Sequence, residues 1–115
     1  MQVTRIRQTR HLNAPNHTDH SSLGLQGAGI TKTGAFWCGL SHYLPGGRAH
    51  RGASDYERVY VVLEGEITIA TDEGTAVLGP LDSVHIAPRE QRMIENTGPT
   101  PTAVLVVVAN AKPSS

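Results

Sequence analysis

Short apolar stretches alternate with glycine-rich and polar stretches along most of the chain. The clearest is residues 58–63, where valine and tyrosine dominate until Glu64 and Gly65 bring the stretch to an end. Val and Tyr suit a pleated, half-buried strand, and Gly65 supplies the backbone freedom of a tight turn before residues 67–69 begin a return strand. The pattern therefore predicts a β-hairpin centred on Gly65.

Other apolar stretches of similar length predict further strands, and none repeats with the period of a helix. We expect a turn at residues 72–74, and polar loops at residues 11–22 and after the Pro-Gly-Gly sequence of residues 45–47. Residues 103–109 are apolar on both strand faces, so one face should pack inside the fold and the other against a second sheet or a partner subunit. The remaining predicted strands are residues 2–8, a short one around Leu25, and residues 35–44, 75–78, 83–87 and 91–95.

Strand alternation in residues 35–44 predicts the side of the sheet on which one histidine lies. His42 shares a face with Cys38, Leu40 and Leu44, and this apolar face is expected to point inward. A histidine in such a place is either a satisfied core residue or a functional group, and both interpretations stay open at this point.

Composition limits the classes of protein that need to be considered. The 115 residues carry a formal net charge of zero, which fits one domain with a single core. No polybasic surface, bilayer-length apolar run or signal-peptide pattern is present, so neither nucleic acid nor membrane is expected as a partner. Cys38 is the single cysteine, so an internal disulfide is excluded and the cytoplasm is the expected location.

Four segments resemble the motifs of the cupins, which are small jelly-roll barrels: residues 45–47, 60–66, 81–88 and 96–98. The resemblance, to short bacterial cupins of the type 2 conserved-barrel kind, implies an all-β fold. The fold would be a single jelly-roll barrel of two antiparallel sheets with little or no helix. We expect the chain to divide into three parts. An N-terminal edge strand and polar loop would take residues 1–22, the barrel residues 23–110 and a disordered tail residues 111–115.

The positions that hold a metal in most cupins carry unsuitable residues in this chain. Aligned on Gly65 and Asn96, the family pattern of three histidines and a glutamate falls on four positions that hold other residue types in this chain. A guanidinium group offers no lone pair and repels a cation, so no metal is expected, and two arginines would instead attract an anion. The four positions are Gly52, Ser54, Arg58 and Arg92.

If these positions point into the barrel as in the family, alternation also places their neighbours. Arg58 and Tyr60 should line the pocket, whereas His85 should point outward. The two arginines would then need a negative partner in an apolar interior, because an unpaired buried charge is costly. That partner is either a ligand anion or an internal carboxylate such as Glu57, Glu64 or Glu95.

A narrower resemblance, to a subgroup of short bacterial cupins, rests on residues 14–17, 39–47, 57–65 and 81–83. The subgroup has a histidine at the places of His17 and His42, a basic residue at that of Arg58 and an arginine at that of Arg92. At the place of His50 it often has glutamate.

The leading functional hypothesis is an enzyme that acts without a metal on a small anionic, carboxylate-bearing substrate. Arg58 and Arg92, with His50 if it reaches the pocket, would bind the substrate, and His42 with His17 or Tyr60 would move protons. Isomerisation, decarboxylation and elimination fit equally, since each develops negative charge that guanidinium groups stabilise.

Two alternatives belong to other classes. The first is an accessory cupin that binds a small acid without transforming it. The second is a metal-dependent, dioxygenase-like cupin with a divalent metal held by His17, His42 and His50.

We also expect a homodimer. Residues 103–109, with Val59, Val61 and Leu63, supply more apolar strand surface than one small barrel can cover.

Overall fold

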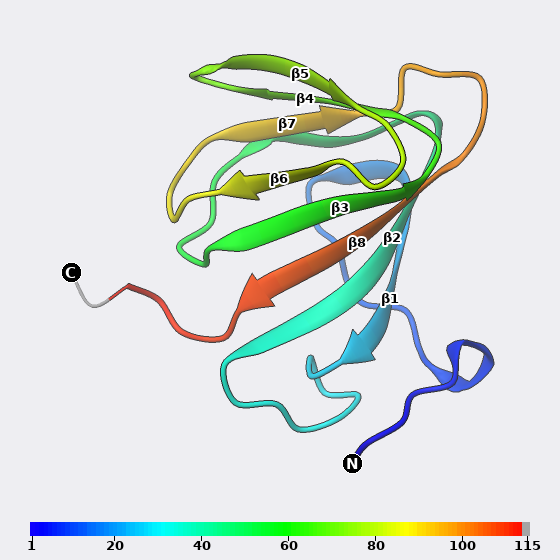
Figure 1. The fold of residues 1–115 in the computed structure, drawn as a ribbon, viewed down its shortest axis with the longest axis vertical. Coiled ribbons are helices and arrows are strands. Elements are labelled where there is room, and N and C mark those ends of the chain that lie inside the picture. The colour runs from blue at the N-terminus through cyan, green and yellow to red at the C-terminus, as the bar shows by residue number, and fades with distance from the viewer. Residues whose placement is uncertain (114–115) are drawn as a thin grey trace.

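The computed structural model describes residues 1–113, and over this range the chain forms eight strands and one short 3-10 helix, η1 (Ile6–Gln8) (Figure 1). No helix in this range is both long and apolar enough to cross a membrane. The strands are β1 (His17–Gln26), β2 (Phe36–Gly52), β3 (Arg58–Glu64), β4 (Ile67–Thr71), β5 (Gly74–Leu78), β6 (Ser83–Ile86), β7 (Arg92–Glu95) and β8 (Thr102–Ala109).

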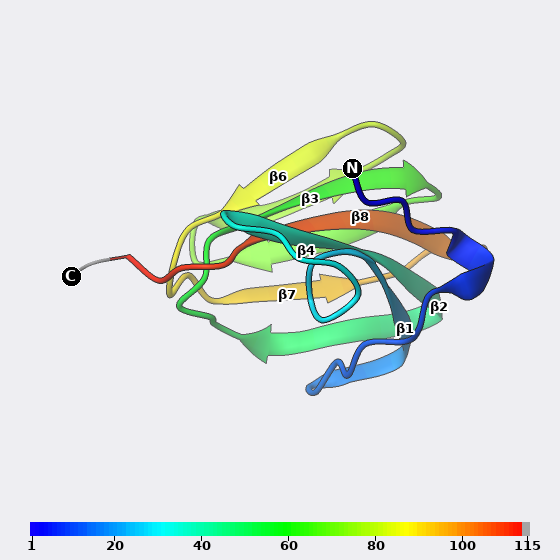
Figure 2. The same ribbon diagram turned by 90° about the horizontal axis from the view of Figure 1, so that it is seen from below.

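All strand pairs are antiparallel, in the order β5-β4-β7-β2-β8-β3-β6, with β1 also paired to β2. The long strand β2 joins the two halves of this path. Its first part pairs with β8 and its last part, from Arg48, pairs with β7. Gly46, at a φ of 82°, lies where one pairing gives way to the other. The sheet therefore folds back on itself into a nearly closed barrel, which confirms the all-β jelly roll (Figure 2).

The core fills the space inside this barrel with side chains from alternate strand positions. Tyr60 and Val62 of β3 face inward, as does Ile86 of β6. His85, the residue before Ile86 on β6, is exposed. The alternation predicted for these strands is confirmed. The buried core cluster is Tyr43, Ala49, Tyr60, Val62, Ile67, Ile69, Ile86, Ile94, Val104, Val106 and Val108.

The predicted hairpin around Gly65 is wrong, because β3 and β4 do not pair. β3 lies between β6 and β8, whereas β4 lies between β5 and β7. Gly65 does make a turn, at a φ of 78°, but the turn carries the chain from one sheet to the other. A Cβ at this position would lie 2.8 Å from the carbonyl oxygen of Pro101, so glycine is also required by close packing. The turn predicted at residues 72–74 does close a hairpin, between β4 and β5.

The amino-terminal region departs from prediction in two places. Residues 2–8 contain η1, with no buried side chain, in place of the predicted edge strand. Strand β1 starts at His17, inside the stretch predicted as a polar loop, because β2 offers its backbone as a partner to these polar residues. Similarly, residues 45–47 lie within β2 and do not open a loop. The last two residues of the predicted tail, 114 and 115, lie outside the described residues.

Asn96 links the bend of β2 to the loop before β8. Its side chain is 1% exposed, donates from Nδ2 to the carbonyl oxygens of Tyr43 (3.0 Å) and Thr100 (2.8 Å), and accepts at Oδ1 from the backbone N–H of Gly98 (3.0 Å). Its backbone N–H donates to Gly47 and its carbonyl accepts from Gly46. This residue therefore satisfies buried backbone groups of two segments that are distant in sequence.

Candidate active site in the barrel

A cavity of about 250 Å³ opens between β1, the first half of β2 and β3. We call it the histidine lobe. Its walls combine aromatic rings with polar and cationic groups, while none of its lining side chains is a carboxylate. The residues that line it are Leu12, Asn13, Ala14, Pro15, His17, His20, Ser22, Trp37, Ser41, Tyr43, Arg58, Tyr60, Arg92 and Val106.

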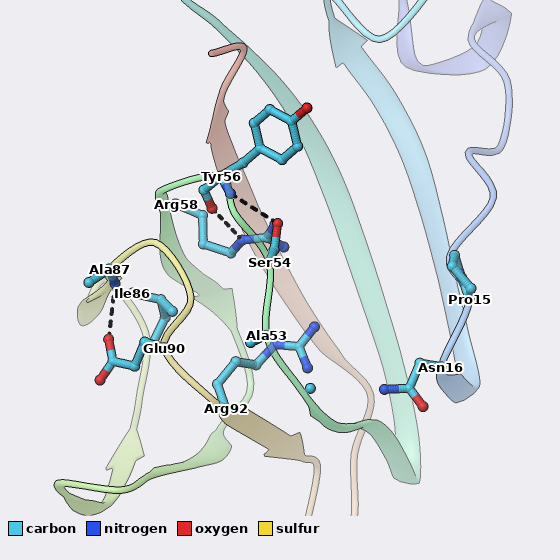
Figure 3. A pocket seen from close by; sticks show the side chains of 11 residues that line it. Pro15, Asn16, Ala53, Ser54, Tyr56, Arg58, Ile86, Ala87, Glu90 and Arg92 are labelled. Atoms are coloured by element: carbon cyan, nitrogen blue, oxygen red, sulfur yellow. Dashed lines mark hydrogen bonds between the residues drawn. The ribbon is translucent and has the colours of Figure 1, made fainter. Parts of the chain in front are cut away.

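A second cavity of about 210 Å³, the serine lobe (Figure 3), shares lining residues with the first. Arg58 from β3 and Arg92 from β7 line both lobes, together with Pro15. All four positions at which the family pattern places metal ligands are found here, which confirms that they face the interior. The residues that line the serine lobe are Pro15, Asn16, Gly52, Ala53, Ser54, Tyr56, Arg58, Ile86, Ala87, Glu90 and Arg92.

The two shared arginines are positioned by neutral oxygen atoms. Arg92 donates from Nη1 to the carbonyl oxygen of His50 (2.9 Å) and from Nε to the hydroxyl of Tyr60 (3.2 Å). Arg58 donates from Nε to the carbonyl oxygen of Tyr56 (3.4 Å). Most N–H donors of both guanidinium groups therefore have no protein partner among the described residues, and they border an open space.

The alternative of an internal salt bridge to these arginines is contradicted. Glu95 pairs with Arg48 (3.1 Å), and Glu57 contacts the ring of His85 at the surface. None of the salt bridges within residues 1–113 includes Arg58 or Arg92. Two fixed positive charges thus meet at one cavity without a salt bridge, since Glu90, the carboxylate that lines the serine lobe, accepts from the backbone N–H of Ala87; this arrangement favours an anionic ligand.

A bulge in β1 brings His17 and His20 onto the same face. In a regular strand, two residues separated by three positions would point to opposite sides. The pairing register with β2 shifts between Thr18 and His20, and Asp19 adopts a φ of 48°. Asp19, which lies opposite residues 44–47 of β2, reverses the alternation through its left-handed backbone, so both rings line the histidine lobe, with centroids 4.3 Å apart.

The ring of His17 is held in one tautomer. Its Nδ1 lies 2.7 Å from the carbonyl oxygen of Pro15, which can only accept, so Nδ1 carries the hydrogen and Nε2 keeps its lone pair. Burial lowers the pKa of His17, and the charges of Arg92, His50 and Arg58 lower it further, against the opposing effect of the Pro15 hydrogen bond. His17 is therefore a neutral base at physiological pH.

His20 lies behind His17, packed on the ring of Tyr43 at 4.7 Å. Both of its ring nitrogens are buried without a hydrogen-bond partner among the described residues. Burial, with smaller contributions from His17, His42 and Arg92, lowers the pKa of His20 to about 4. Burial likewise raises the pKa of Tyr43 well above its usual value. Both groups stay neutral across the physiological range and support the ring of His17 by stacking.

The prediction that His42 faces inward is wrong. On β2 the buried side chains are Ser41 and Tyr43, so His42 points to the opposite side of the sheet and lines neither lobe. The sequence misleads here because the outer face of β2 is as apolar as an inner face. His50 lines neither lobe with its side chain; its Nε2 lies 3.3 Å from the Thr18 hydroxyl, and only its carbonyl oxygen takes part, by holding Arg92. The structure thus brings together His17, Tyr60, Arg58 and Arg92 of the predicted residues.

The family's metal position does not suit a metal here. Its four residues are two arginines, a glycine and Ser54. The Ser54 hydroxyl is a weak cation ligand, and the two guanidinium groups beside it repel a cation. Across the part of the chain that the structure describes, no three His, Cys, Asp or Glu side chains gather closely enough to hold a metal ion. His17, His42 and His50, the alternative ligand set, are not brought together.

Comparison with known proteins agrees with this fold. Residues 39–108 match the model of the Cupin domain. The chain is a cupin. A protein of Mycobacterium tuberculosis named Beta-D-galactosidase Rv1717 is 44% identical over 110 residues, which cover 96% of this cupin and 95% of that relative.

Solved structures resemble this cupin in fold at low sequence identity. The polyketide cyclase RemF from Streptomyces resistomycificus superimposes with a TM-score of 0.84 at 19% identity, covering 98% of this chain and 82% of that one. An RmlC-like cupin from Shewanella frigidimarina gives 0.79 at 17%, covering 96% and 92%. A predicted oxalate decarboxylase from Thermotoga maritima gives 0.78 at 19%, covering 95% and 98%. At such identities the likeness shows the fold alone.

Proposed function

We propose that this cupin is an enzyme that binds a small acidic carbohydrate in the barrel and transforms it by acid–base chemistry without a resident metal. One observation carries the proposal: two guanidinium groups without a carboxylate partner and a neutral, tautomer-fixed His17 line the same cavity. The guanidinium groups supply an anion site and the imidazole supplies a base. A carbohydrate is favoured by the aromatic wall of Trp37 and Tyr43 and by the name of the mycobacterial relative.

In the proposed reaction, the substrate carboxylate lies against Arg58 and Arg92. His17 Nε2 takes the proton from the carbon next to this carboxylate, and the C–H electron pair passes into the carboxylate to form an enediolate. The arginines stabilise the added negative charge. The Tyr60 hydroxyl, which accepts from Arg92 Nε, keeps its own hydrogen for a leaving hydroxyl group, which departs as water in an elimination. Delivery of the Tyr60 hydrogen to the other face of the carbon, while His17 keeps the proton that it took, gives an isomerisation instead.

The primary test is exchange of the proton next to the carboxylate in D2O, followed by proton NMR with galacturonate and other small sugar acids. We expect exchange that requires the protein and persists with excess chelator. Binding of an acid without any exchange or conversion would favour the accessory, non-catalytic cupin instead.

The arginines give a second measurement of the anion site. Arg58→Ala or Arg92→Ala is expected to weaken binding of the acid by roughly 1.5–3 kcal/mol, the range for hydrogen bonds to charged groups, and so to raise the apparent KM. Arg51→Ala is the matched control, because Arg51 is exposed and pairs with Asp72 outside both lobes. Unchanged affinity in both cavity variants, measured by isothermal titration calorimetry, would remove the anion site.

Hydrolysis of a neutral β-D-galactoside is the second candidate, favoured by the 44% identity to the mycobacterial protein of that name. Most glycoside hydrolases use two carboxyl groups beside the scissile bond. Glu90 is the single carboxylate among the described residues lining either lobe, and its Oε1 accepts from the backbone N–H of Ala87. Release of nitrophenol from a nitrophenyl β-D-galactoside, lost in Glu90→Gln, would establish hydrolysis in place of the leading proposal.

A further inference from the structure

The arrangement of the two lobes bears on the size of the substrate, given the proposed function. Each lobe alone is smaller than a typical small-molecule site of roughly 300–1,000 Å³, whereas the two together fall within that range. Arg58, Arg92 and Pro15 form the boundary that both lobes share. Figure 3 shows both arginine side chains reaching into the space that Asn16 faces from the other side.

The lobes differ in chemistry. The histidine lobe has the rings of Trp37 and Tyr43 and the base His17. The serine lobe is lined by small groups at residues 52–54, and Asn16 holds its place there by donating to the carbonyl oxygens of His50 and Arg51. A ring that stacks and reacts fits the first lobe, and a second, hydrogen-bonding unit fits the other.

We propose that the substrate has two sugar-sized parts, with the acidic ring in the histidine lobe, its carboxylate at the arginines and the second unit in the serine lobe. The proposal rests on the proposed function and narrows its substrate class to acidic disaccharides or glycosides. The two arginines then serve as the fixed point from which both parts are positioned.

The test compares galacturonate, which fills one lobe, with digalacturonate, which fills two. We expect wild-type protein to bind the dimer at least about tenfold more tightly, since every 1.4 kcal/mol is a factor of ten. Ala53→Trp, at an exposed loop position that lines the serine lobe, should remove this advantage, so that the dimer and galacturonate bind with equal affinity. Ala76→Trp on β5, also exposed and away from both lobes, is the control and should retain the advantage.

Two results would overturn the inference and are distinguishable. Equal affinity for both acids in the wild type would contradict the two-part substrate while leaving the proposed function intact. Binding of neither acid would remove the proposed function together with this inference.

A separate observation concerns the outer face of the sheet formed by β1, β2, β8 and β3. One row of side chains runs straight across these four strands, through the ladder pairs Leu23–Leu40, Leu40–Leu105 and Leu105–Val61. The next row contains Cys38, Val107 and Val59, and the other neighbouring row contains His42 and Ala103. In these three rows, which we call the outer face, the ionisable groups at the margin are Glu64, which pairs with Ala103 at the end of β3, and His85 on the β6 edge.

The outer face is partly exposed, as are Phe36 and Leu63 at its margins. Four strands about 4.8 Å apart and three rows about 7 Å apart give a footprint of roughly 400 Å², about half of the roughly 800 Å² per partner of a standard interface, and Phe36 and Leu63 at the margins add to it. We infer that a second copy of this chain covers it, because apolar rows with Glu64 and His85 only at their margin meet their own copy with little like-charge repulsion, and two such sheets pack about 10 Å apart. The predicted homodimer thus acquires a defined interface.

Light scattering on the wild type at micromolar concentration should give twice the 12.3 kDa chain mass. Leu105→Glu should give the monomer mass, and mixing it with Leu105→Lys should restore the dimer. Val77→Glu makes the same type of change at an exposed position of β5 and should remain dimeric. Cys38 provides a measurement on unaltered protein: its reaction with a thiol reagent should slow as concentration rises. A monomer mass for the wild type, or thiol reactivity independent of concentration, would overturn this interface.

Discussion

His17→Gln is expected to lower turnover by about 10²–10⁴-fold with KM nearly unchanged, as for removal of a general base from an intact site. Nδ1 of His17 is fixed on the Pro15 carbonyl, so Nε2 is the available lone pair beside the two arginines. Because the pKa of His17 is lowered, the neutral base persists below pH 6.5. The acid limb of kcat against pH should therefore lie below pH 6.5, with activity falling as pH falls through it.

Two other histidine variants separate the role of His17 as a base from a general effect of changing a histidine and from a role in packing. His85→Gln changes an exposed ring outside the cavity and should leave kcat unchanged. His20→Phe keeps the ring that packs on His17 and Tyr43 but removes two nitrogens without partners, so most of the turnover should remain. A loss in His17→Gln of less than about threefold would show that another group is the base.

Asn96→Ala should lower the free energy of unfolding by roughly 2–4 kcal/mol, since each lost hydrogen bond costs about 1 kcal/mol and more when a buried partner is left unsatisfied. Three backbone groups lose their partner: the carbonyls of Tyr43 and Thr100 and the N–H of Gly98. Urea denaturation followed by circular dichroism measures the change.

Asn110→Ala is the matched control for this stability effect. Its amide also donates to backbone carbonyls, of Thr33, Gly34 and Phe36, but it is exposed and water can replace these bonds, so a change below about 1 kcal/mol is expected. Asn96→Asp should not restore stability, because a carboxylate would face two carbonyl oxygens. Equal effects at both asparagines would show that the buried position of Asn96 is not what matters.

Sequence reasoning succeeded where the strands are regular. In β3, simple alternation and the position in the cupin motif placed Arg58 and Tyr60 inside the barrel, and the same count placed Ile86 inward on β6. Both the inward-facing core of β3 and β6 and the cationic lining of the cavity follow from these positions. The cupin motifs also located Arg92, although its strand is only four residues long.

Sequence reasoning failed where the alternation of a strand is broken or ambiguous. His42 was assigned inward because its face is apolar, but β2 is apolar on its outer face too, and alternation cannot say which of two apolar faces lies inside. His20 was missed because residues 11–22 were predicted as a polar loop, so no strand face was assigned to it, whereas it lies in β1 with its ring turned into the cavity after the left-handed Asp19. The prediction of a hairpin at Gly65 was wrong because a local turn does not reveal which strands the next strand will pair with.

The irregularity in β1 also bears on how this chain can change in length. Deletion of Asp19 would leave the two histidines two positions apart, and regular alternation then places both rings on the same strand face without any left-handed residue between them. The barrel would still close, because its core residues lie on other strands. In homologous chains, a one-residue gap at this point should therefore be compatible with the same pair of rings in the cavity and with an unchanged fold.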